Sequence, residues 1–213
     1  MQSLWSEADA ERMVARYAQQ GVGRDLALRV YTSRLLGGEP KLVLHGGGNT
    51  SVKTIVRDLL DEEIEVLCVK GSGWDMEAIE PAGLPAVRLA PLRKLRERGT
   101  LADGEMVRVQ RANLVDPGAP NPSVETLLHA FLPHKYVDHT HSTAVLSLTD
   151  QPDAAERCAD LYGRRLGLVP LHHAGLPARQ EGGRDLRRRP GGRRASAVEA
   201  RRLHLWRDGT GSL

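Results

Sequence analysis

The chain of 213 residues is poor in aromatic side chains and in cysteine. Aromatic residues make up only 4% of it, so leucine, valine and alanine must fill most of the core. The two cysteines, Cys68 and Cys158, stand apart in apolar runs and form no Cys-x-x-Cys pattern. This usage argues against a disulfide framework or a cysteine-ligated zinc site, and it indicates buried free thiols in a reducing compartment.

Long apolar runs are also missing. No stretch approaches the ~18 consecutive apolar residues that a membrane-spanning helix requires. The N-terminal segment MQSLWSEADAER is acidic and lacks the apolar core of a secretory signal peptide. We therefore expect a soluble cytoplasmic protein that has no membrane partner.

Positive charge is present, but it is concentrated near the C-terminus. The net charge is +3 and the isoelectric point is about 9.1. Ten arginines lie between Ala178 and Arg207, whereas the first 170 residues are close to neutral or acidic. The segment 178–197 has no apolar periodicity and is rich in Arg, Gly, Ala and Pro, which is typical of disorder. We expect one folded domain at 1–170 and a disordered Arg/Gly/Pro-rich tail at 171–213.

Hydrophobic periodicity, capping residues and glycines predict the elements of the folded part. Helices are expected between the caps Ser6 and Gly21 and at 25–36, 91–98, 103–114, 123–131, 143–149 and 153–165. Strands are expected at 41–44, 65–70, 135–141 and 166–171. Ser123 is expected to cap its helix and to place Glu125 in the first turn.

The stretch VDHTHS carries two histidines, His139 and His141, two residues apart. In a strand, residues i and i+2 point to the same side, so both rings can aim at one point. Neutral imidazole suits zinc, cobalt, iron or manganese. Such a pair is also common as structural or surface histidines, and Asp138 is either a group that supports a ligand or a solvated strand residue.

Two glycine-rich loops each follow a short apolar strand. The first is GGGN at 46–49, and the second is GSG at 71–73. Their backbone N–H groups, with the Asn49 amide and the hydroxyls of Ser51 and Ser72, are the groups that bind phosphate. Neither loop matches the Walker or the dinucleotide pattern. Each loop taken singly also fits a plain tight turn, and Glu125 taken alone fits a carboxylate that serves the helix dipole.

Four separated motifs are more specific in combination. They are LVLHGGGNTSVK, VKGSGWDM, IEPAGLPAVRL and NPSVETLLHAFLPHKYVDHTHS, in this order. Together they resemble the class II aldolase/adducin family, most closely its branch of rhamnulose-1-phosphate aldolases that carry a fused short-chain dehydrogenase. The resemblance runs from about residue 5 to about residue 170. It implies a three-layer α/β/α fold with a central, mostly antiparallel sheet, and a homotetramer with active sites near the subunit interfaces.

The resemblance also implies a role for particular residues. His139 and His141 match the family's metal-binding pair, which holds zinc or another divalent transition metal. Glu125 matches its catalytic carboxylate. The positions that match the phosphate-binding residues are Gly48, Asn49, Ser72, Gly73 and Ser123. Val124 departs from aldolases that have a second serine there, which removes one hydrogen bond to the phosphate.

The implied reaction is the cleavage of a ketose 1-phosphate to dihydroxyacetone phosphate and L-lactaldehyde. A divalent metal would act as a Lewis acid that stabilises the enediolate left when the C3–C4 bond breaks. Glu125 would move the proton. The sugar phosphate is therefore the expected partner, and nucleic acid is not.

The family's third metal ligand is a histidine in a late KHG motif that follows an MPGF-like turn, and neither motif occurs in this chain. The tail histidines His172, His173 and His204 have different neighbours. Read one base later, degenerate codons for LHHAGLP at 171–177 permit MPGF, and those for EARRLHLWRD at 199–208 permit KHG. We hypothesise that the reading frame is shifted near codon 170, which leaves the C-terminal part of the fold incomplete and impairs catalysis.

Two other functions fit parts of the sequence. A non-catalytic adducin-like module would keep the fold without the metal chemistry, although His139, His141 and Glu125 argue against an old loss. A binder of nucleic acid or of an acidic surface would use the arginines of a genuine basic tail.

Overall fold

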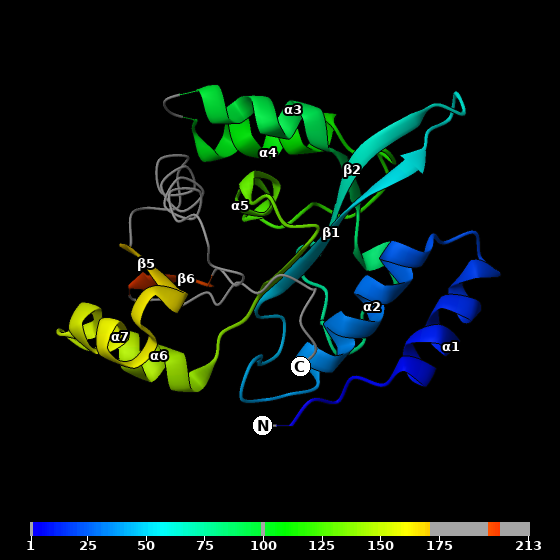
Figure 1. The fold of residues 1–213 in the computed structure, drawn as a ribbon. Helices are drawn as coiled ribbons and strands as arrows, with labels where there is room; N and C mark the ends of the chain where they lie inside the picture. The colour runs from blue at the N-terminus through cyan, green and yellow to red at the C-terminus, as the bar shows by residue number, and fades with distance from the viewer. Residues whose placement is uncertain (1, 99–100, 171–195, 201–213) are drawn as a thin grey trace.

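The structure, a computed structural model, describes residues 2–98, 101–170 and 196–200 (Figure 1). Its main sheet has four strands in the order β3-β2-β1-β4, and every neighbouring pair is antiparallel. The strands are β1 (Asn49–Arg57), β2 (Glu63–Val69), β3 (Ala86–Arg88) and β4 (Tyr136–His139). This arrangement confirms the predicted α/β fold with a central antiparallel sheet.

Helices cover both faces of this sheet, as Figure 1 shows. One layer contains α1 (Glu7–Ala18) and α2 (Arg24–Gly37), and α2 packs on β1. The other layer contains α3 (Leu89–Lys94), α4 (Asp103–Ala112) and α5 (Thr126–Phe131), of which α3 and α5 pack on β2. The predicted three layers are thus present.

The side chains of β2 point alternately into two clusters of the core. Val66 and Cys68 point into the α2 layer, where they pack with Val30 and Tyr17. Leu67 and Val69 point into the opposite cluster, which α3, α4 and α5 complete. Because side chains alternate with a period of two, a slip of one residue would exchange the two faces, so this pattern fixes the register.

The C-terminal elements form a smaller layer beside the main sheet (Figure 1). They are α6 (Thr143–Thr149), α7 (Ala154–Tyr162) and a parallel pair of strands, β5 (Leu166–Pro170) and β6 (Ser196–Ala200). Three short 3-10 helices complete the elements: η1 (Pro81–Gly83), η2 (Leu95–Glu97) and η3 (Gly163–Arg165). The sequence did not predict β6, which lies within the tail expected to be disordered. The rest of that tail lies outside the described residues.

Most predicted helices are confirmed within a few residues, including the first, where the Ser6 hydroxyl accepts the Asp9 N–H. The predicted strand at 41–44 is wrong. The N–H groups of Leu42 and Val43 both bond to the Glu39 carbonyl, at 2.8 and 3.1 Å, so this segment is a turn.

Two boundaries near the expected site also differ from the prediction. Strand β4 ends at His139, so His141 lies in the segment beyond it. Helix α5 begins at Thr126 with Glu125 at its N-cap position. The Ser123 hydroxyl accepts the Glu125 N–H at 3.2 Å, so Ser123 stabilises the turn before the helix and does not cap the helix.

Candidate active site at one end of the sheet

The antiparallel pairing of the strands brings the candidate residues to one end of the sheet. Asn49 opens β1 and lies opposite His139, which closes β4. Strand β2 ends beside them, because Ser51 pairs with Val69. An isolated bridge between Gly71 and Pro122 then brings in the segment that leads to α5. The antiparallel topology thus gathers residues that are far apart in the sequence.

Asn49 is at the centre of this group and is only 3% exposed. Its side-chain amide donates to the Ser123 hydroxyl at 3.0 Å and to the Glu125 carboxylate. Its amide oxygen Oδ1 is buried and, within the part of the chain that the structure describes, meets no hydrogen-bond donor. A buried acceptor without a donor is costly, so a ligand hydroxyl at this point would be favourable.

The two histidine rings lie next to each other, with centroids 4.9 Å apart and planes inclined by 59°. His139 is buried, and its Nδ1 atom lies 2.9 Å from Glu125 Oε2. When His139 carries its proton on Nδ1, it donates to Glu125 and has its basic lone pair on Nε2. A carboxylate in this position fixes the ring of a metal-binding histidine.

His141 is held by the loops rather than by the strand. Its N–H donates to the Leu42 carbonyl at 2.8 Å. A Cβ atom at Gly47 would lie 3.2 Å from its Nδ1 atom, so the glycine loop packs directly against the ring. The turn at 41–44 therefore positions one of the two imidazoles.

The two imidazoles do not by themselves complete a set of metal ligands. Among residues 2–98 and 101–170, no group of three His, Cys, Asp or Glu side chains is gathered as a set of ligands. A catalytic zinc site takes three protein ligands and leaves one position open. The two imidazoles fit such a set by their chemistry, and a third ligand has to come from elsewhere. The tail histidines that the sequence offers, His172, His173 and His204, lie outside the described residues.

The two glycine loops are tied to the segment before α5. The Ser72 N–H donates to the Asn121 carbonyl at 2.9 Å, and the Ser123 N–H donates to the Lys70 carbonyl at 3.2 Å. The Ser72 N–H, which we expected to face a phosphate, is therefore used within the protein. Ser72 is exposed, and Gly73 beside it has a φ of +83°.

The sequence interpretation missed Lys70, which lies under the first glycine loop. Its side chain is 4% exposed, and its ammonium group donates to the Gly46 carbonyl at 3.1 Å. Burial lowers the pKa of Lys70, and the charges of Asp75 and Glu125 act in the opposite direction. A lysine directly before Gly-Ser-Gly at the end of an apolar strand was the available signal.

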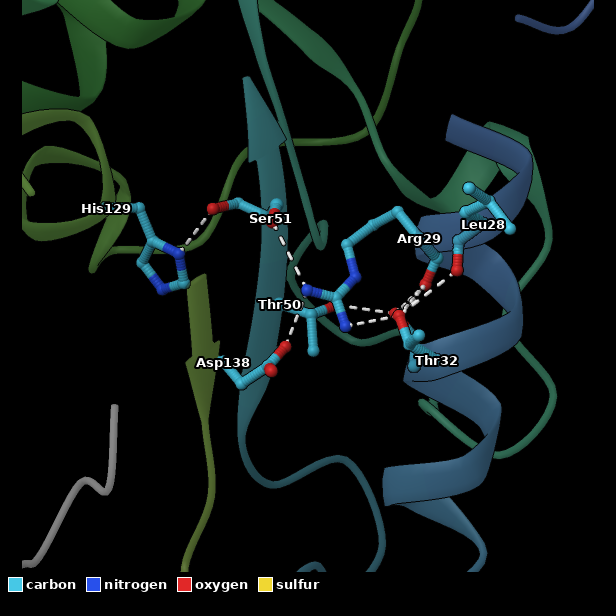
Figure 2. Close-up of polar contacts among 8 residues, drawn as sticks. Leu28, Arg29, Thr32, Thr50, Ser51, His129 and Asp138 are labelled. Carbon is cyan, nitrogen blue, oxygen red and sulfur yellow. Dashed lines mark hydrogen bonds and ion pairs between the residues drawn. The ribbon is translucent and has the colours of Figure 1, made fainter. Parts of the chain in front are cut away.

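His129 is a second missed residue. It lies one helical turn after Glu125 on α5, is fully buried, and bonds through Nδ1 to the Ser51 hydroxyl at 2.7 Å (Figure 2). Burial holds the pKa of His129 well below its ordinary value, although the Glu125 charge opposes this shift. His129 is therefore neutral at physiological pH and joins β1 to α5.

Asp138 is not the solvated strand residue that was one of its two expected roles. It points to the face opposite His139, where it forms an ion pair with Arg29 on α2 at 2.5 Å (Figure 2). Its side chain is mostly buried, so it is not a solvated strand residue.

Every helix in the described part of the chain is too short or too polar to span a bilayer.

A family profile of the Class II Aldolase and Adducin N-terminal domain matches residues 27–202. The match begins in α2, includes every candidate site residue and extends beyond residue 170, where the motif resemblance ended.

Solved structures agree with this fold. The N-terminal class II aldolase domain of a conserved protein from Thermoplasma acidophilum has a TM-score of 0.83, with 33% identity over 98% of this chain and 89% of that one. An L-fuculose 1-phosphate aldolase has a TM-score of 0.55, with 14% identity over 88% of this chain and 77% of that one. At this identity the second likeness shows the fold alone.

One curated relative is the uncharacterized oxidoreductase YuxG of Bacillus subtilis strain 168. It is 41% identical over 147 residues, which are 69% of this chain and 21% of that protein. The chain thus spans about a fifth of the length of this relative.

Proposed function

Since the chain belongs to the class II aldolase and adducin family, we propose that it is a metal-dependent aldolase domain that acts on a ketose 1-phosphate. The proposed reaction is the cleavage of a rhamnulose 1-phosphate-type substrate to dihydroxyacetone phosphate and L-lactaldehyde. The observation that carries the proposal is the contact of Glu125 with both Asn49 and His139, beside the ring of His141.

His139 and His141 would hold a divalent cation, zinc or another transition metal. When bound, such a cation supplies Lewis-acid stabilisation of negative charge on the substrate oxygens. The contact between His139 Nδ1 and Glu125 would keep the ring in the tautomer that binds a metal through Nε2. A third ligand remains necessary for high affinity.

Glu125 would move the proton during the cleavage. Asn49 and His139 hold its carboxylate in one orientation, and its side chain remains 23% exposed, so a substrate can reach it. A positioned carboxylate of this kind typically contributes ~10²–10⁴-fold to the rate.

The substrate phosphate would lie against Gly48, Asn49, Ser72, Gly73 and Ser123. These groups are neutral, whereas a phosphate carries close to two negative charges, so a counter-charge is needed. Lys70 provides it from beneath the first glycine loop. Val124 is exposed at the position of the second serine and offers no hydrogen bond. The fold shared with L-fuculose 1-phosphate aldolase supports this substrate class by analogy.

We also propose that the reading frame of the tail is shifted. The shifted frame permits Lys-His-Gly over the codons of residues 199–202, with the histidine over those of Ala200 and Arg201. Resequencing of codons 165–210 tests this proposal. A coding strand in which no single-base shift restores both MPGF and KHG refutes it and leaves a genuine basic tail.

A non-catalytic, adducin-like module is the second candidate. It is favoured by the absence of a three-ligand group among the described residues.

For the intact family member we expect a homotetramer. The length of the B. subtilis relative leaves room for the fused dehydrogenase that the resemblance implies.

An aldol-cleavage assay distinguishes the two candidates. L-rhamnulose 1-phosphate is incubated with the chain and Zn²⁺, and L-lactaldehyde is measured. We expect slow cleavage that stops on chelation and in His139→Ala and His141→Ala, and faster cleavage by a frame-restored version. Cleavage that survives chelation refutes the aldolase proposal, and a complete lack of cleavage in both versions favours the adducin-like module.

A further inference from the structure

A buried ion pair lies on the sheet face opposite the candidate site. Arg29 on α2 is 1% exposed and pairs with Asp138 of β4 at 2.5 Å. Its guanidinium group also donates to the Ser51 carbonyl of β1 at 3.4 Å and to the Thr32 hydroxyl at 2.5 Å. Figure 2 shows this group between the helix and the two strands. One side chain therefore connects α2, β1 and β4.

The strand that it holds is short. Four residue pairs join β4 to β1, from Asn49 opposite His139 to Val52 opposite Tyr136. Strand β4 is also at the edge of the described sheet. A short edge strand has few backbone hydrogen bonds to define its register, and a slip of one residue would move every side chain to the other face. In β4 that slip would take His139 away from Glu125.

Arg29 and Asp138 oppose such a slip. Asp138 is the residue before His139, so its side chain reaches the α2 layer only when the His139 ring faces Glu125. The planar guanidinium also bonds the neighbouring strand, and its fixed geometry restricts the spacing of the two strands more than an ammonium would. A stabilising role alone is better served by apolar residues, because burying an ion pair is often no more favourable than burying apolar side chains.

We propose that Arg29 and Asp138 are positioning residues that set the place of the His139 and His141 rings for the cation. This inference rests on the proposed metal site. It adds to that proposal two residues on the opposite face that contact neither the cation nor the substrate.

The test replaces the pair without leaving a buried charge. The variant Arg29→Met/Asp138→Leu keeps an apolar contact in place of the ion pair, and thermal unfolding shows whether it folds. Co²⁺ is titrated into the full chain, and paramagnetic broadening of the two histidine ring resonances reports binding. We expect a cooperatively folded variant whose Co²⁺ dissociation constant is about tenfold higher, the lower end of the effect of residues that support metal ligands.

Lys135→Met is the matched control. Lys135 forms a half-exposed ion pair with Asp25 of α2. This pair also joins α2 to the chain beside β4, but at the opposite end of the strand from His139. We expect its dissociation constant to stay close to that of the unaltered chain, because exposed pairs contribute little. In the metal-free protein, the ring ¹⁵N signals of His139 should shift in the double variant and not in Lys135→Met.

Each outcome has a separate meaning. A folded double variant with unchanged Co²⁺ affinity and unchanged His139 signals overturns this inference and leaves the proposed function intact. An equal loss of affinity in Lys135→Met also overturns it, since any loosening of β4 would then suffice. If the unaltered chain binds no Co²⁺ through His139 and His141, the proposed function fails and this inference fails with it.

If the double variant does not fold, Arg29→Lys replaces it. This change keeps the charge and loses the planar fork, so the same rise in dissociation constant is expected, and unchanged affinity overturns the inference.

Discussion

Gly48 is the point at which the first glycine loop approaches β4 most closely. Its φ is +64°, and a Cβ atom built there would lie 2.6 Å from the His139 carbonyl oxygen. An alanine would therefore suffer the strain of the left-handed conformation, ~1–2 kcal/mol, and would also push β4 away from the loop. Overpacking against a backbone atom adds ~1–3 kcal/mol. We expect Gly48→Ala to lower the free energy of unfolding by about 3 kcal/mol.

Gly73 provides the matched control, because it has a φ of +83° and nothing within 4 Å of its would-be Cβ atom. Gly73→Ala should lose only the strain, ~1–2 kcal/mol. Urea unfolding of both variants, followed by circular dichroism, measures the two free energies. The excess loss in Gly48→Ala isolates the contact with β4. Equal losses in the two variants would show that this contact is absent and that the loop does not support the histidine strand.

Three further predictions concern ionisable groups. Burial lowers the pKa of Lys53 from 10.5 to about 7, so the unfolded chain binds its proton more tightly and stability should rise between pH 7 and 10.5. Lys53→Met should remove this rise, and an unchanged pH profile of unfolding would contradict the assignment. Glu125→Gln should lower aldol cleavage ~10²–10⁴-fold while phosphate still binds, and a smaller loss would exclude Glu125 as the proton-transfer group. Lys70→Met should raise KM for a ketose phosphate by about tenfold, the loss of one charged hydrogen bond, and should spare the unphosphorylated ketose. Equal effects on both would exclude Lys70 as the counter-charge.

Local patterns were enough to predict most of the fold. The helix at 7–18 has a side-chain N-cap, the helix at 24–37 ends at a pair of glycines, and β2 lies between polar turns, so each carries its own signal. The strand predicted at 41–44 was wrong because the apolar residues there resemble a strand, whereas the N–H groups of Leu42 and Val43 bond to the Glu39 carbonyl. Such a choice depends on contacts with the His141 segment, which a local pattern does not contain.

The candidate site was predictable only in part for the same reason. The spacing of His139 and His141 indicated that the rings meet, and the structure places them together. The ion pair of Arg29 with Asp138 joins residues more than 100 positions apart, and no motif contains both. Strand β6 also depends on a distant partner, β5, and its own sequence, SAVEA, is too short to predict a strand.

The proposed function requires that His139 and His141 together bind a divalent cation. Isothermal titration of Zn²⁺ into the full chain tests it most directly, with His139→Ala/His141→Ala beside it and His134→Ala as a control. His134 lies in the loop before β4, where its carbonyl accepts from Lys53. We expect zinc binding to be lost in the double variant and kept in His134→Ala. Equal zinc binding by the double variant and the unaltered chain would contradict it.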